Sequence, residues 1–320
     1  MAEMSQSGDI RTCDGLNLYL RRDTPRRPKG IVVILHALGE HGGCYDEVCR
    51  VLNLAGYGVY RFDCRGHGRS DGPRGDIQDF RDYLADTDLV VDQARMVFPD
   101  LPLFLLGYGM GGLVSASYTA LYPDKVDGEI TAAAAVRMMP ALDFLNGSGM
   151  TRHRERGDER FSLLMPEEYG QNRRADDRFM LDSVTIRLAG NVWFVGADWF
   201  AQHIKDVVTP LLILHGEEDG FVPPESSRWF YAGVSSPDRS LRLYPNRGHA
   251  LIQEQGEVLD EVVDWLDRHS QRPVRFLGNY GYEKRADRGQ PFFCLSRPVL
   301  WYICTLRWGR RCDGPGPSCS

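Results

Sequence analysis

The sequence predicts an α/β fold in which helices cover both faces of a mostly parallel central sheet and a helical cap is inserted into the core. Short, β-branched apolar runs alternate with segments of helical periodicity, which is typical of such a sheet. Between about residues 137 and 205 the alternation stops, and charges, methionine pairs and aromatic residues mix without strand periodicity. The length of 320 residues, 42% of them hydrophobic, is enough for one large domain with an insertion.

The elements follow in order along the chain. The expected strands are apolar runs that indicate burial on both faces: 30–35, 58–62, 101–106, 211–214 and 241–244. The expected helices carry apolar residues at helical spacing: 46–55, 80–98, 112–121, 225–232 and 257–267. The domain prediction is therefore a core over 1–136, a cap (lid) over 137–205, a second part of the core over 206–270 and a basic C-terminal extension over 271–320.

Charge and cysteine content exclude several function classes. The formal net charge of −6 argues against nucleic acid as the partner, since phosphate binding needs a concentrated basic face. None of the 8 cysteines has zinc-ligand spacing, so we expect Cys13, Cys44, Cys49 and Cys64 to be free thiols. We expect the function to need neither a metal nor a cofactor. The polar start lacks the apolar segment of a secretory signal, which favours a cytoplasmic location.

The C-terminal extension is basic and rich in aromatic residues and cysteine, and it leaves two interpretations open. It is either a peripheral membrane anchor that binds anionic lipid or a disordered extension outside the fold.

The most informative segment, residues 103–112, reads LFLLGYGMGG: a buried strand, a glycine-rich turn and a helix. This is nearly the nucleophile elbow G-x-S-x-G, in which small residues flank a serine held in a strained turn at a helix N-terminus. Gly107 and Gly111 occupy the two glycine positions, and Gly109 occupies the serine position. The elbow therefore has no nucleophilic oxygen.

An acid and a base follow the elbow at the ends of two later strands. Asp219 lies in His-Gly-Glu-Glu-Asp after the strand 211–214, and His249 lies on the loop after the strand 241–244. The order elbow, acid, base is the order of a hydrolase triad built on such a sheet. His249 would act as general base and then acid, while Asp219 would fix its tautomer.

Two further turns follow the strands 30–35 and 58–62. The first, His-Ala-Leu-Gly-Glu-His at 36–41, could direct the Leu38 N–H, together with the Met110 N–H, at a developing oxyanion. We expect His36 and Glu40 to hold this turn by hydrogen bonds. The second, Asp-Cys-Arg-Gly-His-Gly-Arg-Ser at 63–70, would support the same edge of the sheet.

With these motifs the chain resembles the monoacylglycerol lipase and lysophospholipase group of α/β-hydrolases, which is related in fold to the S33 serine aminopeptidases. The resemblance covers about residues 10 to 270 and rests on H-x-x-G-E-H, D-x-R-G-H-G-x-S, G-x-x-M-G-G, H-G-x-x-D and His249, in this order. It implies an α/β-hydrolase fold, cleavage of acyl esters and a cap that shapes an acyl channel. The chain departs from the pattern at Gly109 and at Ala37, where the family usually has glycine.

Apolar cap residues are candidates for contact with an acyl chain, although such residues also form ordinary hydrophobic core: Met138, Phe144, Trp193, Phe194 and Trp199. No other residue is a convincing replacement nucleophile. Ser148 lies in the presumed cap, Ser70 is of the helix-capping type, and Cys64 is more typical of a small buried hydrophobe.

Three hypotheses about function follow. The first is a carboxylic-ester hydrolase of monoacylglycerol lipase or lysophospholipase type that lacks its nucleophile and binds an acyl ester without cleaving it. The second is a pseudo-hydrolase that binds a lipid or another small molecule. The third is an enzyme in which His249 and Asp219 abstract a proton, as in a lyase or a cofactor-free oxygenase.

Overall fold

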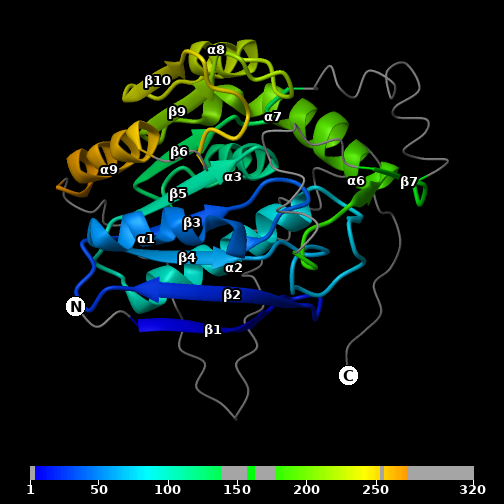
Figure 1. The fold of residues 1–320 in the computed structure, drawn as a ribbon, viewed down its shortest axis with the longest axis horizontal. Coiled ribbons are helices and arrows are strands. Elements are labelled where there is room, and N and C mark those ends of the chain that lie inside the picture. Colours follow the sequence, from blue (N-terminus) through cyan, green and yellow to red (C-terminus); the bar gives the residue numbers. More distant parts are fainter. Residues whose placement is uncertain (1–3, 138–156, 163–176, 253–255, 272–320) are drawn as a thin grey trace, which may run out of the picture. The chain divides into compact units, whose positions relative to one another are not determined.

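A computed structural model describes residues 4–137, 157–162, 177–252 and 256–271 (Figure 1). Eight strands form one sheet in the order β1-β2-β4-β3-β5-β6-β9-β10. The strands are β1 (Met4–Arg11), β2 (Asn17–Thr24), β3 (Gly30–Leu35), β4 (Tyr57–Phe62), β5 (Leu103–Tyr108), β6 (Gly128–Ala132), β9 (Leu211–Gly216) and β10 (Arg239–Tyr244). Only β1 and β2 run antiparallel to their neighbours, so the expected mostly parallel sheet is confirmed.

Helices lie on both faces of this sheet, as expected. The longer ones are α1 (Asp46–Leu54), α2 (Arg81–Val97), α3 (Met110–Leu121), α8 (Glu225–Gly233) and α9 (Glu257–Ser270). Alternate residues of β3 separate the two cores: Ile31 and Val33 pack on the side of α2 and α3, and Val32 packs on the side of α1 and α9. This alternation explains why the central strands read as continuous apolar runs.

The described part of the predicted cap contains strands as well as helices. Its elements are β7 (Arg160–Ser162), β8 (Ser183–Thr185), α6 (Ile186–Gly190), the π-helix η4 (Asn191–Gly196), α7 (Ala197–His203) and the short 3₁₀ helix η5 (Ile204–Asp206); another 3₁₀ helix, η1 (Gly42–Tyr45), precedes α1. β7 and β8 pair antiparallel, which the sequence pattern did not predict. The cap boundaries at 137 and 205 and the extension at 271–320 stay predictions.

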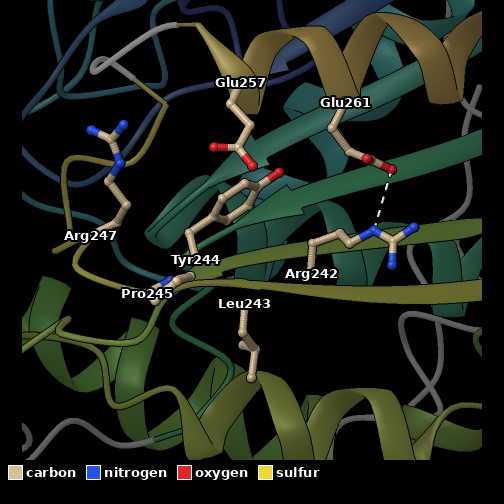
Figure 2. Close-up of a pocket in the computed structure, with 7 residues that line it drawn as sticks. All are labelled: Arg242, Leu243, Tyr244, Pro245, Arg247, Glu257 and Glu261. Carbon is tan, nitrogen blue, oxygen red and sulfur yellow. Dashed lines mark ion pairs between the residues drawn. The ribbon is translucent and has the colours of Figure 1, made fainter.

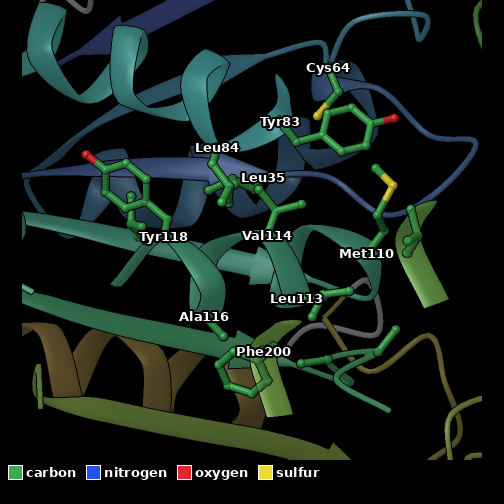
Figure 3. Packing of buried hydrophobic residues seen from close by; sticks show 14 of the residues in the cluster. Leu35, Cys64, Tyr83, Leu84, Met110, Leu113, Val114, Ala116, Tyr118 and Phe200 are labelled. Atoms are coloured by element: carbon green, nitrogen blue, oxygen red, sulfur yellow. The ribbon is translucent and has the colours of Figure 1, made fainter. Parts of the chain in front are cut away.

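The hydrophobic core extends from the sheet into the cap region (Figure 3). Phe200 of α7 is fully buried in the same cluster as Leu113 and Ala116 of α3. Cys64 and the ring of Tyr83 belong to this cluster too. The helix that follows the elbow is therefore held between the sheet and the described cap residues.

A buried carboxyl group beneath α3 makes stability depend on pH. Glu129 of β6 is fully buried, and its two oxygens accept hydrogen bonds of 2.7 Å from Ser115 and Thr119. Burial raises the pKa of Glu129 to about 7, against the lowering effect of the two hydroxyl groups. Because the folded state keeps this proton longer than the unfolded chain does, stability is full below about pH 4.5 and falls as pH rises toward 7.

We expect Glu129→Gln to reduce this dependence, since an amide fills the same space without ionising. The variant should match the parent in stability near pH 5 and exceed it at pH 8, by on the order of 3 kcal/mol for a shift of this size. Urea unfolding of both proteins at the two pH values measures the difference. Equal slopes of stability against pH in the two proteins would contradict the prediction.

Candidate active site

The backbone of the elbow has the strained geometry that the sequence pattern requires. Gly109 lies between β5 and α3 with φ 54° and ψ −115°, a region that costs a residue with a Cβ on the order of 1–3 kcal/mol. Its N–H donates to the Ala132 carbonyl at 3.1 Å. Its carbonyl accepts from the N–H groups of Gly112, Leu113 and Ala135. Hydrogen bonds from the N–H and to the carbonyl of Gly109 thus fix the turn on both sides of its Cα atom, which carries no side chain.

Asp219 and His249 meet although they are 30 residues apart in the chain. His249 Nδ1 lies 2.7 Å from Asp219 Oδ2, and both side chains are buried. The other carboxylate oxygen, Oδ1, accepts from the backbone N–H groups of Phe221 and Val222, each at 2.8 Å. These two bonds fix the plane of the carboxylate and direct Oδ2 at the imidazole.

His215, at the end of β9, adds a second histidine contact to Asp219. Its Nδ1 lies 2.6 Å from the Ser227 hydroxyl, and its Nε2 lies 2.8 Å from the Val222 carbonyl and 3.3 Å from Asp219 Oδ2. Burial alone would raise the pKa of Asp219, but the hydrogen bonds from His215 and His249 outweigh it and hold that pKa well below its usual range. Asp219 is therefore a carboxylate at neutral pH, as a partner for an imidazolium must be.

Tyr108 connects the base to the elbow, and sequence reasoning missed it. Its hydroxyl donates to the His249 carbonyl at 2.6 Å, and its ring lies against the imidazole with centroids 5.3 Å apart. Phe221 packs on the same imidazole at 5.1 Å. Because Tyr108 directly precedes Gly109, these contacts fix the His249 loop to the turn where a nucleophile would stand. The sequence signal that could have indicated this role is a tyrosine between two glycines in the elbow.

The predicted oxyanion residues are Leu38, in the 36–41 turn, and Met110, in the elbow. Leu38 and Met110 are both buried. Within the described residues, neither backbone N–H has a hydrogen-bond acceptor. Leu38 follows Ala37 and Met110 follows Gly109, and Ala37 and Gly109 are adjacent in space. Two N–H groups without an acceptor in a buried turn are what an oxyanion hole requires, although the role itself stays a prediction.

The hydrogen bonds expected of His36 and Glu40 are confirmed. His36 Nε2 accepts from the Cys64 N–H at 2.9 Å, which leaves Nδ1–H to donate to the Ala37 carbonyl at 2.8 Å. Glu40 accepts from the Tyr45 hydroxyl at 2.6 Å and from the Ala37 N–H at 3.3 Å. The 36–41 turn is thereby joined to the 63–70 turn.

Three of the residues predicted to contact an acyl chain lie in the described part of the chain. Met138 and Phe144 lie outside the described residues. Trp193 of η4 is buried in the main core cluster, and Phe194 and Trp199 pack against that cluster while partly exposed. Trp199 also stacks on His203, with ring centroids 4.1 Å apart. Whether these three touch a ligand stays a prediction.

None of the described alternative nucleophiles is suited to attack. Ser70 is buried and holds two strands, since its hydroxyl donates to the Asp63 carbonyl and accepts from the Tyr19 N–H. Cys64 is buried, and burial raises the pKa of its thiol well above the usual range, so it carries no thiolate. Ser148 lies outside the described residues.

One group of side chains in the described ranges brings potential metal ligands together, but its hydrogen bonds do not favour an ion. His41, Cys44 and Asp177 bring potential ligand atoms within 4.8 Å of one another. However, His41 Nδ1 accepts from the Gly43 N–H, so the proton of the neutral ring sits on Nε2 and faces Asp177 at 2.7 Å. A nitrogen in that state has no lone pair for a metal. The described cysteines, Cys13, Cys44, Cys49 and Cys64, are free thiols, as expected.

A surface hollow of about 280 Å³ lies between β10 and the start of α9 (Figure 2). It is polar, and Arg242 forms an ion pair of 3.5 Å with Glu261 across it. It lies next to the His249 loop but includes none of the predicted site residues. No helix in the described ranges is long and apolar enough to cross a bilayer.

The sheet, the elbow and the acid–base pair at the strand ends together define an α/β-hydrolase. The model of the serine aminopeptidase S33 family (Hydrolase_4) matches residues 26–256, and the chain belongs to this family. Within it, the chain is similar to monoacylglycerol lipases.

Known relatives support this grouping along most of their length. The monoacylglycerol lipase of Mycolicibacterium smegmatis is 29% identical over 251 residues, 76% of this chain and 89% of that protein. The human monoglyceride lipase is 26% identical over 264 residues, 78% of this chain and 85% of that protein. The crystal structure of the Paleococcus ferrophilus monoacylglycerol lipase superposes with a TM-score of 0.67 at 25% identity, over 83% of this chain and 99% of that one.

Proposed function

We propose that this member of a monoglyceride lipase-type ester hydrolase family binds an acyl ester or a similar lipid-like molecule and does not cleave it. One observation carries the proposal: the acid–base pair is assembled at 2.7 Å and the elbow backbone is in place, yet Gly109 has no atom that can attack a carbonyl. In the monoacylglycerol lipase relatives the substrate class is an acylglycerol, which is the ligand class we propose here. The cap over 137–205, with Trp193, Phe194 and Trp199, would contact the acyl chain.

The size of the expected defect follows from serine hydrolases in general. Removal of the serine of subtilisin costs about 10⁶ in kcat, roughly 8 kcal/mol of transition-state stabilisation. What remains, an oxyanion hole and binding, gives about 10³ to 10⁴ over the reaction in water. Bound ester should therefore stay intact on the time scale of an ordinary assay.

Restoring the hydroxyl tests the proposal. We expect Gly109→Ser to hydrolyse p-nitrophenyl esters and monoacylglycerols at least about 10²-fold faster than the unmodified chain, because the variant supplies an oxygen that the Asp219–His249 pair could activate. Gly109→Ala is the matched control, since it adds the Cβ atom at the same strained backbone without an oxygen, and it should stay inactive. Brisk hydrolysis by the unmodified protein would overturn the proposal.

Binding is measured separately on the unmodified chain. A monoacylglycerol ether, which has no scissile ester, should bind in isothermal titration and displace a fluorescent fatty-acyl probe. If neither the ether nor an ester binds, the lipid-like ligand is wrong even where the serine variant gains activity on small esters.

A second candidate function keeps catalysis without a serine. The Asp219–His249 pair and the two N–H groups of Leu38 and Met110 could support proton abstraction and stabilise an enolate, as a lyase or a cofactor-free oxygenase requires. Any turnover by the unmodified chain that disappears in His249→Ala favours this candidate over ligand binding alone. A location in the cytoplasm and contact with a membrane surface both stay predictions from the sequence.

A further inference from the structure

The position of Ala37 bears directly on the missing nucleophile. A Cβ atom built on Gly109 would lie 3.1 Å from the Ala37 Cβ and 3.8 Å from its Cα; apart from its two chain neighbours, no other described residue comes within 4 Å. Two methyl-type carbons at 3.1 Å are well inside the 3.5–4.0 Å at which carbon atoms attract each other. The space for a side chain at 109 is therefore open except on the side where the Ala37 methyl group stands.

Neither residue is free to move away from that contact. The Ala37 N–H donates to the Tyr45 hydroxyl at 3.1 Å and to Glu40, and the Ala37 carbonyl accepts from His36 Nδ1 and from the Glu40 N–H. Ala37 is buried, with 4% of its surface exposed. Gly109 is fixed by its four backbone hydrogen bonds on the other side. A serine at 109 would thus have to be accommodated by tilting its own Cβ or by displacing a hydrogen-bonded turn.

We infer that Ala37 is a positioning residue of this site, whose methyl group keeps a side chain at position 109 out of the orientation needed for attack. The inference rests on the proposed function, because it concerns the geometry of a restored nucleophile. The absence of ester cleavage then has two parts, the missing hydroxyl at 109 and the extra methyl at 37. Removing the methyl alone restores no oxygen, and adding the serine alone leaves its Oγ displaced relative to His249 and to the Leu38 N–H.

The test compares four full-length proteins: the unmodified chain, Ala37→Gly, Gly109→Ser and the double variant. Each is treated with an alkyl fluorophosphonate, in which the serine oxygen forms a bond to phosphorus, fluoride leaves and the hydroxyl proton passes to His249. We expect the maximal labelling rate of the double variant to be at least tenfold higher than that of Gly109→Ser. The fluorophosphonate concentration that gives the half-maximal rate should be the same for both variants. A purely structural effect of Ala37→Gly would not raise the maximal labelling rate while leaving the half-maximal concentration unchanged.

Thermal unfolding of the same set, together with Gly109→Ala, provides a readout that needs no activity. Ala37→Gly should lower the melting temperature when position 109 is glycine, because glycine increases the entropy of the unfolded chain. It should lower the melting temperature less, or raise it, when position 109 is serine or alanine, since it then relieves the Cβ contact. Ala55→Gly, in the C-cap of α1, is the matched control and should have the same effect in every background.

The outcomes separate the two claims. If Gly109→Ser and the double variant react equally fast, Ala37 has no positioning role and the inference is wrong, whereas the proposed function stands. If the effect of Ala37→Gly on melting is the same in all backgrounds, the inference is also wrong. If melting shows the coupling but neither serine variant reacts, the Cβ contact is real but Ala37 does not control attack, so the inference is wrong; the proposed function is then decided by the binding of the ether and the ester.

Discussion

In the Ala37→Gly/Gly109→Ser chain, Asp219→Asn is expected to lower the rate of ester cleavage by about 10⁴-fold, down to the background of the unmodified protein. The reason lies in the orientation that the backbone imposes on an amide at this position. Oδ1 accepts from the N–H groups of Phe221 and Val222. An asparagine must keep its carbonyl oxygen there, so its NH₂ group points at His249 Nδ1.

The imidazole then has to accept at Nδ1, and its proton moves to Nε2, the nitrogen that should take the proton from serine. The base is thus held in the wrong tautomer while the geometry of the site is nearly unchanged. Fluorophosphonate labelling and p-nitrophenyl ester hydrolysis measure the loss, and circular dichroism melting shows whether the fold is kept. Glu218→Gln is the control: the neighbouring side chain is exposed, and its loss of charge should change the rate less than twofold. Equal rates for Asp219→Asn and its parent would exclude the assigned role of Asp219.

The alternation of strands and helices was predictable because β3, β4, β5 and β9 are covered on both faces and consist mostly of apolar residues. The strands that were missed lack this signal. β1 is a largely exposed polar strand at the edge of the sheet. β6 contains Gly128 and the buried Glu129, whose carboxyl group is stabilised by the hydroxyls of Ser115 and Thr119 on the preceding helix α3. Stabilisation of a buried carboxyl group by a neighbouring element cannot be read from local periodicity.

The places of Asp219 and His249 were predictable because the carboxyl ends of parallel strands meet at one edge of a sheet. Their pairing was expected from the order elbow, acid, base, whereas the support from Tyr108 and the closeness of Ala37 to Gly109 were not predictable. Each of these depends on side-chain orientation in turns whose backbone is set by hydrogen bonds between segments. The start of α3 also differs: the helix begins at Met110, two residues before the expected start at Gly112, because Gly111 and Gly112 both belong to its first turn.

That first turn yields the largest expected effect on stability. A Cβ on Gly111 would overlap the Leu35 carbonyl group and lie 2.7 Å from the His36 carbonyl oxygen. Both are backbone atoms, one at the end of β3 and the other in the turn that holds the oxyanion residue, so neither can rotate away. We expect Gly111→Ala to destabilise the protein by about 3–5 kcal/mol, in the range of severe overpacking.

Helix propensity alone predicts the opposite sign for Gly111→Ala, since alanine is favoured over glycine inside a helix by about 1 kcal/mol. The measured sign in urea unfolding therefore decides whether close packing of α3 on β3 governs this position. Gly220→Ala is the matched control, because a Cβ there comes within 4 Å of no described residue other than its chain neighbours; its effect should stay within about 0.5 kcal/mol. A Gly111→Ala protein as stable as the parent would mean that the elbow helix can move relative to β3. In that case the turn at Ala37 could also move, and a serine at 109 would be accommodated without any change at position 37.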